Sequence, residues 1–232
     1  MFGVCLKNEL FMTTGLQRPY LVIENALEPE FAERLRTDLL TSRAWRARVS
    51  NDRYDINREY QDKMPSEYSF SRDAFKMNSP SAPQSVKELY KYLNSDECLR
   101  WICRVSGRQC NAFDAACARY LEGNYLTRHN DQYSESNKAR EVTTRSVTFN
   151  YYLTKVWKPE WGGRFVWENP RGEIAPAFNT LVMFLVGPDS MHHVEKVNES
   201  ATEPRLAVTG WFTTTRKRGS RKLNIGGNRT ES

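Results

Sequence analysis

The sequence contains no apolar run long enough to cross a lipid bilayer, which excludes a helical membrane protein. Its first residues carry Lys7 and Glu9 where a secretory signal peptide needs an unbroken apolar stretch. The five cysteines form no CxxC pair, which argues against a disulfide framework or a cysteine-rich zinc site. These absences together predict a cytoplasmic protein with reduced, mostly buried thiols and no membrane partner.

Histidine is scarce as well, with three copies in 232 residues. A site built on imidazole therefore has few candidates, and their positions become informative. Positive charge, in contrast, is in excess, with a formal net charge of +6. Residues 216–232 hold six basic residues and one acidic residue, a composition that can attract nucleic acid but is more often a solvated terminus. We expect a basic, flexible tail over 216–232 and no nucleic-acid partner.

A chain of this length is sufficient for one domain with a sizeable core. We expect that domain to span residues 1–215, with an N-terminal helical part and lid over 1–114. Apolar residues at helical spacing predict three helices, near residues 29–40, 84–93 and 95–105. Ser95 is suited to cap the last of them. The stretch Trp45–Pro83 is polar and aromatic without a clear period, so it is either a substrate lid or an ordinary surface excursion.

From about residue 115 to residue 215 the character of the sequence changes to β. Four short segments are rich in β-branched and aromatic residues: SVTFNYYL, GRFVWE, NTLVMFLV and RLAVTGWFT. Turn residues such as Gly162-Gly163 and Asn169-Pro170 separate them. Short strands at even spacing favour a sandwich or barrel over a parallel α/β sheet. The predicted fold class is therefore α+β but mainly β, with N-terminal helices packed on a jelly-roll core.

Two of the three histidines and one aspartate form a candidate metal site. His129 and Asp131 are two residues apart, so in an extended segment both side chains would lie on the same side. His192 follows the apolar segment NTLVMFLV. Two imidazoles and one carboxylate leave coordination positions open, which suits non-haem Fe(II) that must bind further ligands. An HxD triplet also occurs by chance, so other residues must decide between a metal site and packed histidines.

A second signal comes from polar residues on the predicted strands. Arg205 begins RLAVTGWF, where it shares a strand face with Thr209 and Trp211. A buried arginine is costly without a carboxylate partner, and a dicarboxylate ligand would supply one to the guanidinium fork. One face of SVTFNYYL is polar too, and it either lines a ligand pocket or faces solvent. Its residues are Ser146, Thr148, Asn150 and Tyr152.

Six sequence blocks follow one another in the order YLEGNYLTRHND, RSVTFNYYL, W-GGRF, P-FNTLVMF, SMHHVEKV and RLAVTGWF. They extend from about Ala118 to Thr213, and they resemble the prolyl 4-hydroxylase-like group of Fe(II)/2-oxoglutarate-dependent dioxygenases. The resemblance implies a double-stranded β-helix core and an HxD…H iron site made by His129, Asp131 and His192. It also implies 2-oxoglutarate and O2 as co-substrates, with ascorbate as a candidate reductant.

The resemblance assigns further roles around the iron. Arg205 corresponds to the arginine that binds the far carboxylate of 2-oxoglutarate, and Tyr152 to a tyrosine that shares it. Tyr120 resembles a tyrosine that lines the pocket ahead of the iron motif. In the S-x-H-x-V block the ligand falls on His192, although strand parity alone does not distinguish it from His193. Four more residues are expected in the substrate pocket by position, although each could be structural: Tyr125, Arg145, Asn150 and Trp211.

The activity that the resemblance implies is hydroxylation of an aliphatic C–H bond, coupled to oxidative decarboxylation of 2-oxoglutarate. A prolyl residue of a protein is the expected substrate, and a free amino acid or small metabolite is the alternative. Two other classes stay open. A cupin-like metalloprotein would use the same metal ligands without 2-oxoglutarate and would have no use for Arg205 and Tyr152. A basic nucleic-acid-binding protein would depend on its tail and be indifferent to iron.

Overall fold

The computed structural model describes residues 19–50, 68–136 and 141–217. Among these residues the α-helices are α1 (Pro29–Thr41), α3 (Gln84–Leu93) and α4 (Asp96–Ser106). The first strands are β1 (Tyr20–Glu24), β2 (Arg46–Ser50), β3 (Phe70–Lys76) and β4 (Ala112–Tyr120). The next are β5 (Tyr125–His129), β6 (Ser134–Ser136), β7 (Glu141–Tyr152) and β8 (Phe165–Glu168), the last preceded by the 3-10 helix η2 (Pro159–Trp161). The chain continues through β9 (Arg171–Ile174), β10 (Thr180–Leu185), β11 (His192–Val194) and β12 (Arg205–Lys217).

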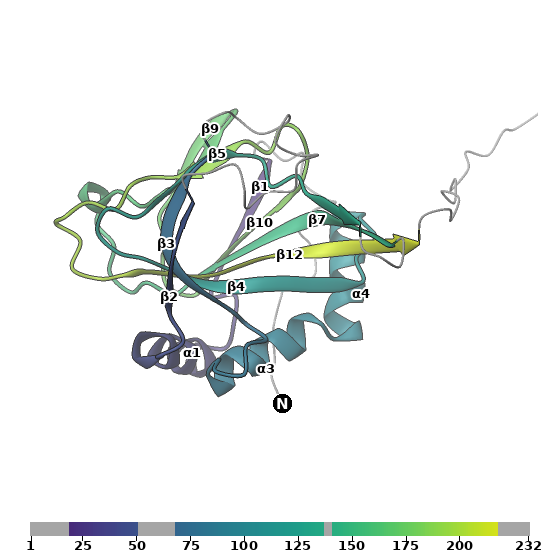
Figure 1. Cartoon of the computed structure of the whole chain (residues 1–232), viewed down its shortest axis with the longest axis horizontal. Coiled ribbons are helices and arrows are strands. Elements are labelled where there is room, and N and C mark those ends of the chain that lie inside the picture. Colours follow the sequence, from purple (N-terminus) through teal and green to yellow (C-terminus); the bar gives the residue numbers. More distant parts are fainter. Residues whose placement is uncertain (1–18, 51–67, 137–140, 218–232) are drawn as a thin grey trace, which may run out of the picture.

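The strands form one curled sheet of antiparallel ladders in the order β1-β10-β7-β12-β4-β3-β5-β11-β8-β9. Off this path, β2 pairs with β3 and β6 pairs with β7. The long strands β7 and β12 pair with each other and lie between β10 and β4. The sheet folds over, so that β5 and β9 lie above β4, β7 and β12 in Figure 1. The prediction of a mainly β core is therefore confirmed.

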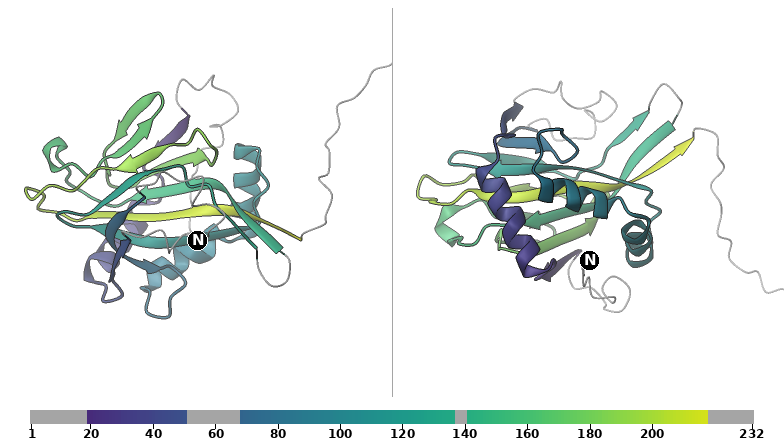
Figure 2. Two further views of the ribbon diagram at one scale, coloured as in Figure 1. Left: turned by 45° about the horizontal axis from the view of Figure 1, so that its top comes forward. Right: turned by 90° about the horizontal axis from the view of Figure 1, so that it is seen from below.

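The helices pack on the face of the sheet that is turned away from β5 and β9 (Figures 1 and 2). All three predicted helices are confirmed, with ends within one or two residues of those expected. The hydroxyl of Ser95 accepts a 3.2 Å hydrogen bond from the Cys98 N–H, so it caps α4 as predicted. Apolar side chains of the helices join the main core with aromatic residues of the long strands, among them Phe113, Phe149 and Phe212. This layer of helices stiffens the strands that carry the site.

The stretch Trp45–Pro83 contains more regular structure than its sequence indicates. β2 and β3 pair in register, with Arg46 opposite Ala74, and β3 continues onto β4. The segments RARVS and FSRDAFK combine charged and small residues, so their apolar alternation is weak. Residues 51–67 of the predicted lid lie outside the described residues. The two strands that flank them belong to the sheet.

The described cysteines and the end of β12 bear on two further predictions. The cysteines that the structure describes, Cys98, Cys103, Cys110 and Cys117, are free, and all but Cys103 are buried. This confirms the prediction of reduced, mostly buried thiols for those four. In the ranges 19–50, 68–136 and 141–217, no helix has the length and apolar character needed to cross a membrane. β12 continues two residues into the predicted tail, of which residues 218–232 lie outside the described residues.

Candidate metal centre and active site

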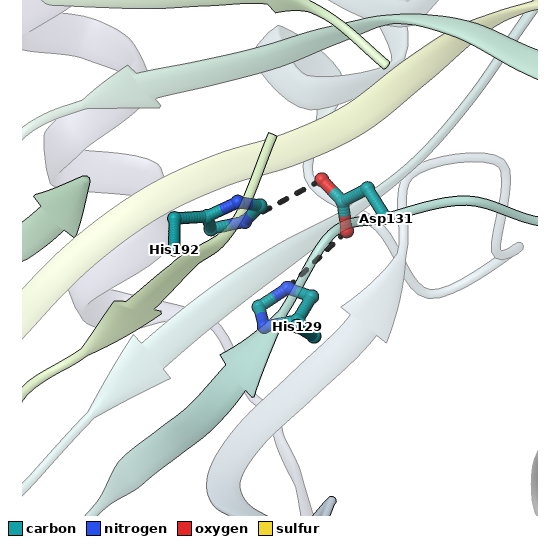
Figure 3. Close-up of side chains that lie close together, drawn as sticks. All are labelled: His129, Asp131 and His192. Atoms are coloured by element: carbon teal, nitrogen blue, oxygen red, sulfur yellow. Dashed lines mark ion pairs between the residues drawn. The ribbon is translucent and has the colours of Figure 1, made fainter. Parts of the chain in front are cut away.

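Two histidines and an aspartate meet at one point of the curled sheet (Figure 3). His129 ends β5, Asp131 follows two residues later, and His192 begins β11, the strand that pairs with β5. One ligand atom from each lies within 4.8 Å of the others, and all three residues are buried. His129 Nε2 lies 3.3 Å from Asp131 Oδ1, and His192 Nε2 lies 3.6 Å from Asp131 Oδ2. Such donors can hold one metal ion and leave coordination positions open.

The backbone at Asp131 differs from the geometry that its spacing predicts. β5 ends at His129, and Asp131 has a φ of 60°, in the left-handed region that residues other than glycine rarely adopt. The aspartate therefore reaches the site through a turn after the strand and not through strand alternation. Thr148 on β7 holds it there, because its Oγ1 donates a 3.0 Å hydrogen bond to Asp131 Oδ2. Unusual backbone of this kind persists where the surrounding contacts fix it.

Both imidazoles are oriented through their Nδ1 atoms. His129 Nδ1 lies 2.8 Å from the carbonyl oxygen of Thr127, and His192 Nδ1 lies 2.7 Å from that of Ser190. Because a carbonyl oxygen only accepts, Nδ1 carries the proton in each ring and Nε2 keeps its lone pair for a metal. Ser190 Oγ also donates a 2.7 Å hydrogen bond to the Asn130 carbonyl oxygen. That bond ties together the segments that carry the two histidines.

The neighbouring histidine, His193, faces away from the cluster. Its Nδ1 lies 2.7 Å from Glu168 Oε1, and its side chain is 29% exposed. His192 is 3% exposed as a residue, and its ring stacks on Phe165 at 5.0 Å between ring centres. Phe184 meets the same ring edge-on at 4.9 Å. The pairing of β11 with β5 and β8 thus turns His192 toward the cluster and His193 away from it. The sequence alone did not decide which of the two faces inward.

Burial and electrostatics set the protonation of the cluster. Burial raises the pKa of Asp131, but the close approach of His129 and His192 outweighs it and holds the pKa well below its usual range. Burial, reinforced by the neighbouring His129, lowers the pKa of His192 to about 3. At neutral pH the site therefore presents a carboxylate and a neutral His192 imidazole. These are the protonation states that metal binding requires.

The low pKa of His192 makes the stability of the metal-free protein depend on pH. In the unfolded chain this residue takes up a proton below its ordinary pKa of 6.5, whereas in the folded protein it stays neutral down to about 3. The unfolded state then binds more protons, so the free energy of unfolding falls as the pH is lowered through this interval, by up to about 1.4 kcal/mol per pH unit. Urea titrations of the metal-free protein across the interval measure the slope. An equal slope in His192→Gln would contradict the prediction.

A buried arginine, Arg205, lies beside the cluster. Arg205 begins β12, is 3% exposed, and forms no ion pair with an acidic residue of the described ranges. Its guanidinium carbon lies 4.8 Å from the ring centre of Tyr120 and 5.0 Å from that of Tyr152. Tyr152 Oη is buried and has no hydrogen-bond partner among the described residues. Burial raises the pKa of Tyr152 to about 12 against the opposing effect of Arg205, so the phenol is a neutral donor.

A double-glycine turn supplies the one carbonyl that Arg205 contacts. Arg205 Nε donates a 2.7 Å hydrogen bond to the Gly163 carbonyl oxygen. Gly162 and Gly163 have φ values of 64° and 61°, a region that glycine adopts without a steric penalty. A Cβ atom on Gly162 would collide with the carbonyl oxygen of Lys196. The block W-GGRF therefore has a structural reason, because it fixes the orientation of the guanidinium.

A cavity of about 140 Å³ joins the metal cluster to Arg205. Four of the residues expected around it do line it: Tyr120, Arg145, Asn150 and Trp211. Two other expected residues are not among those that line it: Tyr152, which contacts Arg205, and Tyr125, whose hydroxyl accepts a 3.2 Å hydrogen bond from Ser69 Oγ. The predicted inner face of β12 is confirmed, because Arg205, Ala207, Thr209 and Trp211 all face the cavity.

Two further cavity residues, Tyr68 and Arg72, come from the stretch that the sequence presents as irregular. The Tyr68 ring lies edge-on to His129, at 5.7 Å between ring centres. Arg72 lies on β3, two residues before Ala74, which pairs with the cavity residue Ala118. If FSRDAFK is assigned as a strand next to β4, residues two apart share one face, so Arg72 lies on the same face as Ala74. This weak alternation is the sequence signal that could have identified Arg72.

The sequence that forms this site matches a protein-family model. The model, described as the 2OG-Fe(II) oxygenase superfamily, matches residues 115–213. The matched segment includes the three members of the metal cluster and Arg205. The match covers the β-rich part of the chain, from β4 to β12. Proteins of this family use Fe(II), 2-oxoglutarate and O2.

Part of the chain is similar in sequence to prolyl hydroxylases of animals. Mouse (Mus musculus) prolyl 3-hydroxylase OGFOD1 is 30% identical over 122 residues, which cover 48% of this chain and 21% of that protein. Prolyl 3-hydroxylase sudestada1 of Drosophila melanogaster is 28% identical over 132 residues, which cover 48% of this chain and 22% of that protein. The chain therefore spans about a fifth of the length of these relatives.

Solved structures share the fold. A Pseudomonas putida prolyl-4-hydroxylase has a TM-score of 0.58 at 19% identity, over 88% of this chain and 95% of that one. A prolyl hydroxylase from Trichoplax adhaerens, in complex with a peptide fragment of the hypoxia inducible factor oxygen degradation domain, has a TM-score of 0.59 at 18% identity, over 84% of both chains. At such identities the likeness concerns the fold alone, and it confirms the predicted jelly-roll class.

The contacts at this site fit the metal and co-substrate that proteins of the matched family use. Two imidazoles and one carboxylate are a donor set that suits Fe(II) with open positions. The Arg205 guanidinium lacks an acidic partner among the described residues, and the nearby Tyr152 hydroxyl lacks any hydrogen bond there. A carboxylate placed between these donors would accept from both. The metal cluster and Arg205 line the same cavity, and Tyr152 contacts Arg205. A single ligand in that cavity could therefore reach both the metal and the arginine.

Proposed function

We propose that this chain hydroxylates a prolyl residue of a protein and depends on Fe(II) and 2-oxoglutarate. The single observation that carries the proposal is the buried cluster of His129, Asp131 and His192 in one cavity with an arginine that has no counter-ion among the described residues. A cupin-like metalloprotein without 2-oxoglutarate would leave that buried charge uncompensated, which is costly. Binding of a dicarboxylate would compensate the charge of Arg205.

The cluster would hold iron through three atoms of this chain. His129 and His192 would each supply Nε2, because their Nδ1 atoms are engaged with backbone carbonyls. Asp131 would supply one carboxylate oxygen, while Thr148 keeps the group oriented through its bond to Oδ2. When bound, the iron and 2-oxoglutarate supply the oxidising chemistry, which is decarboxylation of the 2-oxo acid coupled to hydroxylation of a C–H bond.

The other end of the co-substrate would be held by Arg205 and Tyr152. The Arg205 Nε is engaged with Gly163, which leaves the terminal nitrogens of the fork for a carboxylate. Tyr152 would add its unpaired hydroxyl as a further donor. Tyr120 packs its ring against Arg205 and would form the wall of this pocket. The aromatic rings of Phe165 and Phe184 around His192 would exclude water from the metal side.

The substrate assignment draws on the relatives. Two similar proteins are named as prolyl 3-hydroxylases, and a solved structure with the same fold is a prolyl hydroxylase with a bound peptide. Arg145, Asn150 and Trp211 line the cavity, and they would contact the substrate. The four free cysteines among the described residues support a reducing compartment, and we place the protein in the cytoplasm.

The test is oxygen transfer to proline. The purified protein, with Fe(II) and 2-oxoglutarate, is incubated under 18O2 with a library of prolyl peptides, their alanine counterparts and free L-proline. We expect succinate release to rise with prolyl peptides and one labelled oxygen atom to enter the proline. Labelling of free L-proline alone would favour the small-molecule alternative. Succinate release that no proline compound stimulates would contradict the proposed substrate class.

A further inference from the structure

The cavity beside the metal cluster holds more positive charge than the proposed reaction uses. Three arginines line it, Arg72 on β3, Arg145 on β7 and Arg205 on β12, and Asp131 is the one acidic residue among its described lining residues. None of the three arginines forms an ion pair with a described acidic residue. Arg205 is buried, and Arg72 and Arg145 are half-buried. Charges removed from water are normally paired, so a guanidinium without an ion pair in this cavity is a candidate binding site for an anion.

Charge balance shows that iron and 2-oxoglutarate do not remove the excess. With neutral imidazoles, three arginines and one aspartate leave two positive charges in the cavity. The two charges of Fe(II) are matched by the two carboxylates of 2-oxoglutarate, so the complete site keeps the same excess. Arg205 is already assigned to the co-substrate. The remaining two guanidiniums therefore need an anion from another source.

Arg72 is the better placed of these two arginines to bind such an anion. Its Nε is buried and has no hydrogen-bond partner among the described residues. The acidic residue beside it in the sequence, Asp73, is engaged elsewhere, in a 2.6 Å ion pair with Arg119. The guanidinium carbon lies 5.2 Å from the ring centre of Phe70, a contact that orients the charge without neutralising it.

Tyr120 adds a second unused donor next to Arg72. Its Oη accepts a 3.1 Å hydrogen bond from Arg72 Nη1, and no acceptor for the phenol proton is found among the described residues. Because Arg72 occupies an acceptor position of that oxygen, the O–H of Tyr120 remains free to donate. The site thus contains two Arg–Tyr pairs, Arg205 with Tyr152 and Arg72 with Tyr120, and each pair has a donor without an acceptor among the described residues. The two pairs adjoin, because the Tyr120 ring also packs on Arg205.

Arg145 adds positive charge to the cavity, but its guanidinium is held between two aromatic rings. Its guanidinium carbon lies 3.4 Å from the ring centre of Trp211 and 4.7 Å from that of Tyr133. Tyr68 interacts with both Arg72 and Arg145, and burial raises its pKa to about 12, so it adds no negative charge at neutral pH. The side of the cavity that carries Tyr68, Arg72 and Arg145 is therefore cationic, and the charge that opposes it among the described lining residues is that of Asp131.

We propose that Arg72 and Tyr120 form a second carboxylate-binding subsite, and that it holds an acidic group of the primary substrate. This inference rests on the proposed function, because it assumes that Arg205 binds 2-oxoglutarate. The shared chemistry is a carboxylate, which an acidic side chain next to the prolyl residue or the α-carboxylate of a free amino acid could supply. In either case the enzyme would discriminate against neutral substrates.

The test compares acid and amide probes that differ only in charge. Calorimetric titration under nitrogen measures binding to the Fe(II)·2-oxoglutarate protein of three pairs: acetyl-Pro-Glu-amide and acetyl-Pro-Gln-amide, acetyl-Glu-Pro-amide and acetyl-Gln-Pro-amide, and L-proline and L-prolinamide. We expect the acid of at least one pair to bind tenfold or more tightly than its amide, about 1.4 kcal/mol. Which pair shows the preference identifies the source of the carboxylate.

Variants locate the preference. Arg72→Gln keeps hydrogen-bonding capacity but removes the charge, and we expect it to reduce the preference to about twofold or less while the affinity for 2-oxoglutarate changes less than about twofold. Arg72→Lys restores the charge and retains part of the preference. Arg128→Gln is the matched control, because Arg128 lies on β5 with its side chain 57% exposed and does not line the cavity. It keeps the full preference.

Four outcomes would overturn the inference. Wild type without any preference for acids, or a preference that survives in Arg72→Gln, removes the subsite. A tenfold loss of 2-oxoglutarate affinity in Arg72→Gln assigns it to the co-substrate instead. The visible charge-transfer band of the Fe(II)·2-oxoglutarate chelate is recorded first in each sample. Its absence in wild type contradicts the proposed function and the inference with it, whereas a normal band without acid preference contradicts the inference alone.

Discussion

Replacing His192 with alanine is expected to abolish the Fe(II)·2-oxoglutarate chelate, whereas replacing the adjacent His193 is expected to leave it intact. The Nε2 of His192 faces Asp131 from inside the cluster, while His193 is paired with Glu168 outside it. With His129 and Asp131 alone, two donors remain from this chain. Loss of a hydrogen-bond partner behind a metal ligand already weakens metal binding or activity about 10–100-fold, so loss of the ligand itself should exceed about 100-fold.

Anaerobic titration of the purified proteins with Fe(II) at saturating 2-oxoglutarate measures this effect through the visible charge-transfer band. His193→Ala is the matched control, because it removes an imidazole one residue away on the same short strand. Its band should form at an iron concentration within about threefold of wild type, since the residue makes no contact with the cluster. A band that survives in His192→Ala and disappears in His193→Ala would reverse the assignment of the ligand.

The choice between these two histidines shows where sequence reasoning ends at this site. The residue types, their spacing and the resemblance of six sequence blocks predicted His129, Asp131 and a histidine after the apolar strand as the ligands, whereas the HxD triplet alone did not. Which residue of β11 points inward depends on its neighbouring strands, because β5 on one side and β8 on the other determine the inner face. The left-handed backbone of Asp131 was not predictable either, since no glycine marks it.

The cationic side of the cavity was missed for a related reason. Arg72 is one of many charged residues between Trp45 and Pro83, and nothing local distinguishes it from a solvated side chain. Its burial depends on β3 lying between β4 and β5, a pairing made by residues distant in the sequence. The helices and the apolar strands needed no such information, because their own periodicity determines which face is buried. Long-range pairing is thus the part of this fold that a single sequence conveys least.

Replacing Arg205 with alanine is expected to remove 2-oxoglutarate binding without destabilising the ligand-free protein. In the protein without ligand, this guanidinium is buried and has one hydrogen bond, to Gly163, and no acidic partner among the described residues. Removing an unpaired buried charge relieves a desolvation penalty, so the melting temperature should stay equal or rise. With ligand, the same change breaks a buried charge pair, a loss of about 2–5 kcal/mol in affinity.

Thermal unfolding with Mn(II) in place of iron, with and without 2-oxoglutarate, separates the two effects. Wild type should gain about 2.7 kcal/mol of stability when the co-substrate is present at 100 times its dissociation constant, and Arg205→Ala should gain almost nothing at that concentration. Arg205→Lys keeps the charge but loses the planar fork, and Tyr152→Phe removes only the unpaired hydroxyl, so both should fall between these limits. Full stabilisation of Arg205→Ala would mean that the buried charge serves another ligand, and the cupin-like alternative would then account better for the metal cluster.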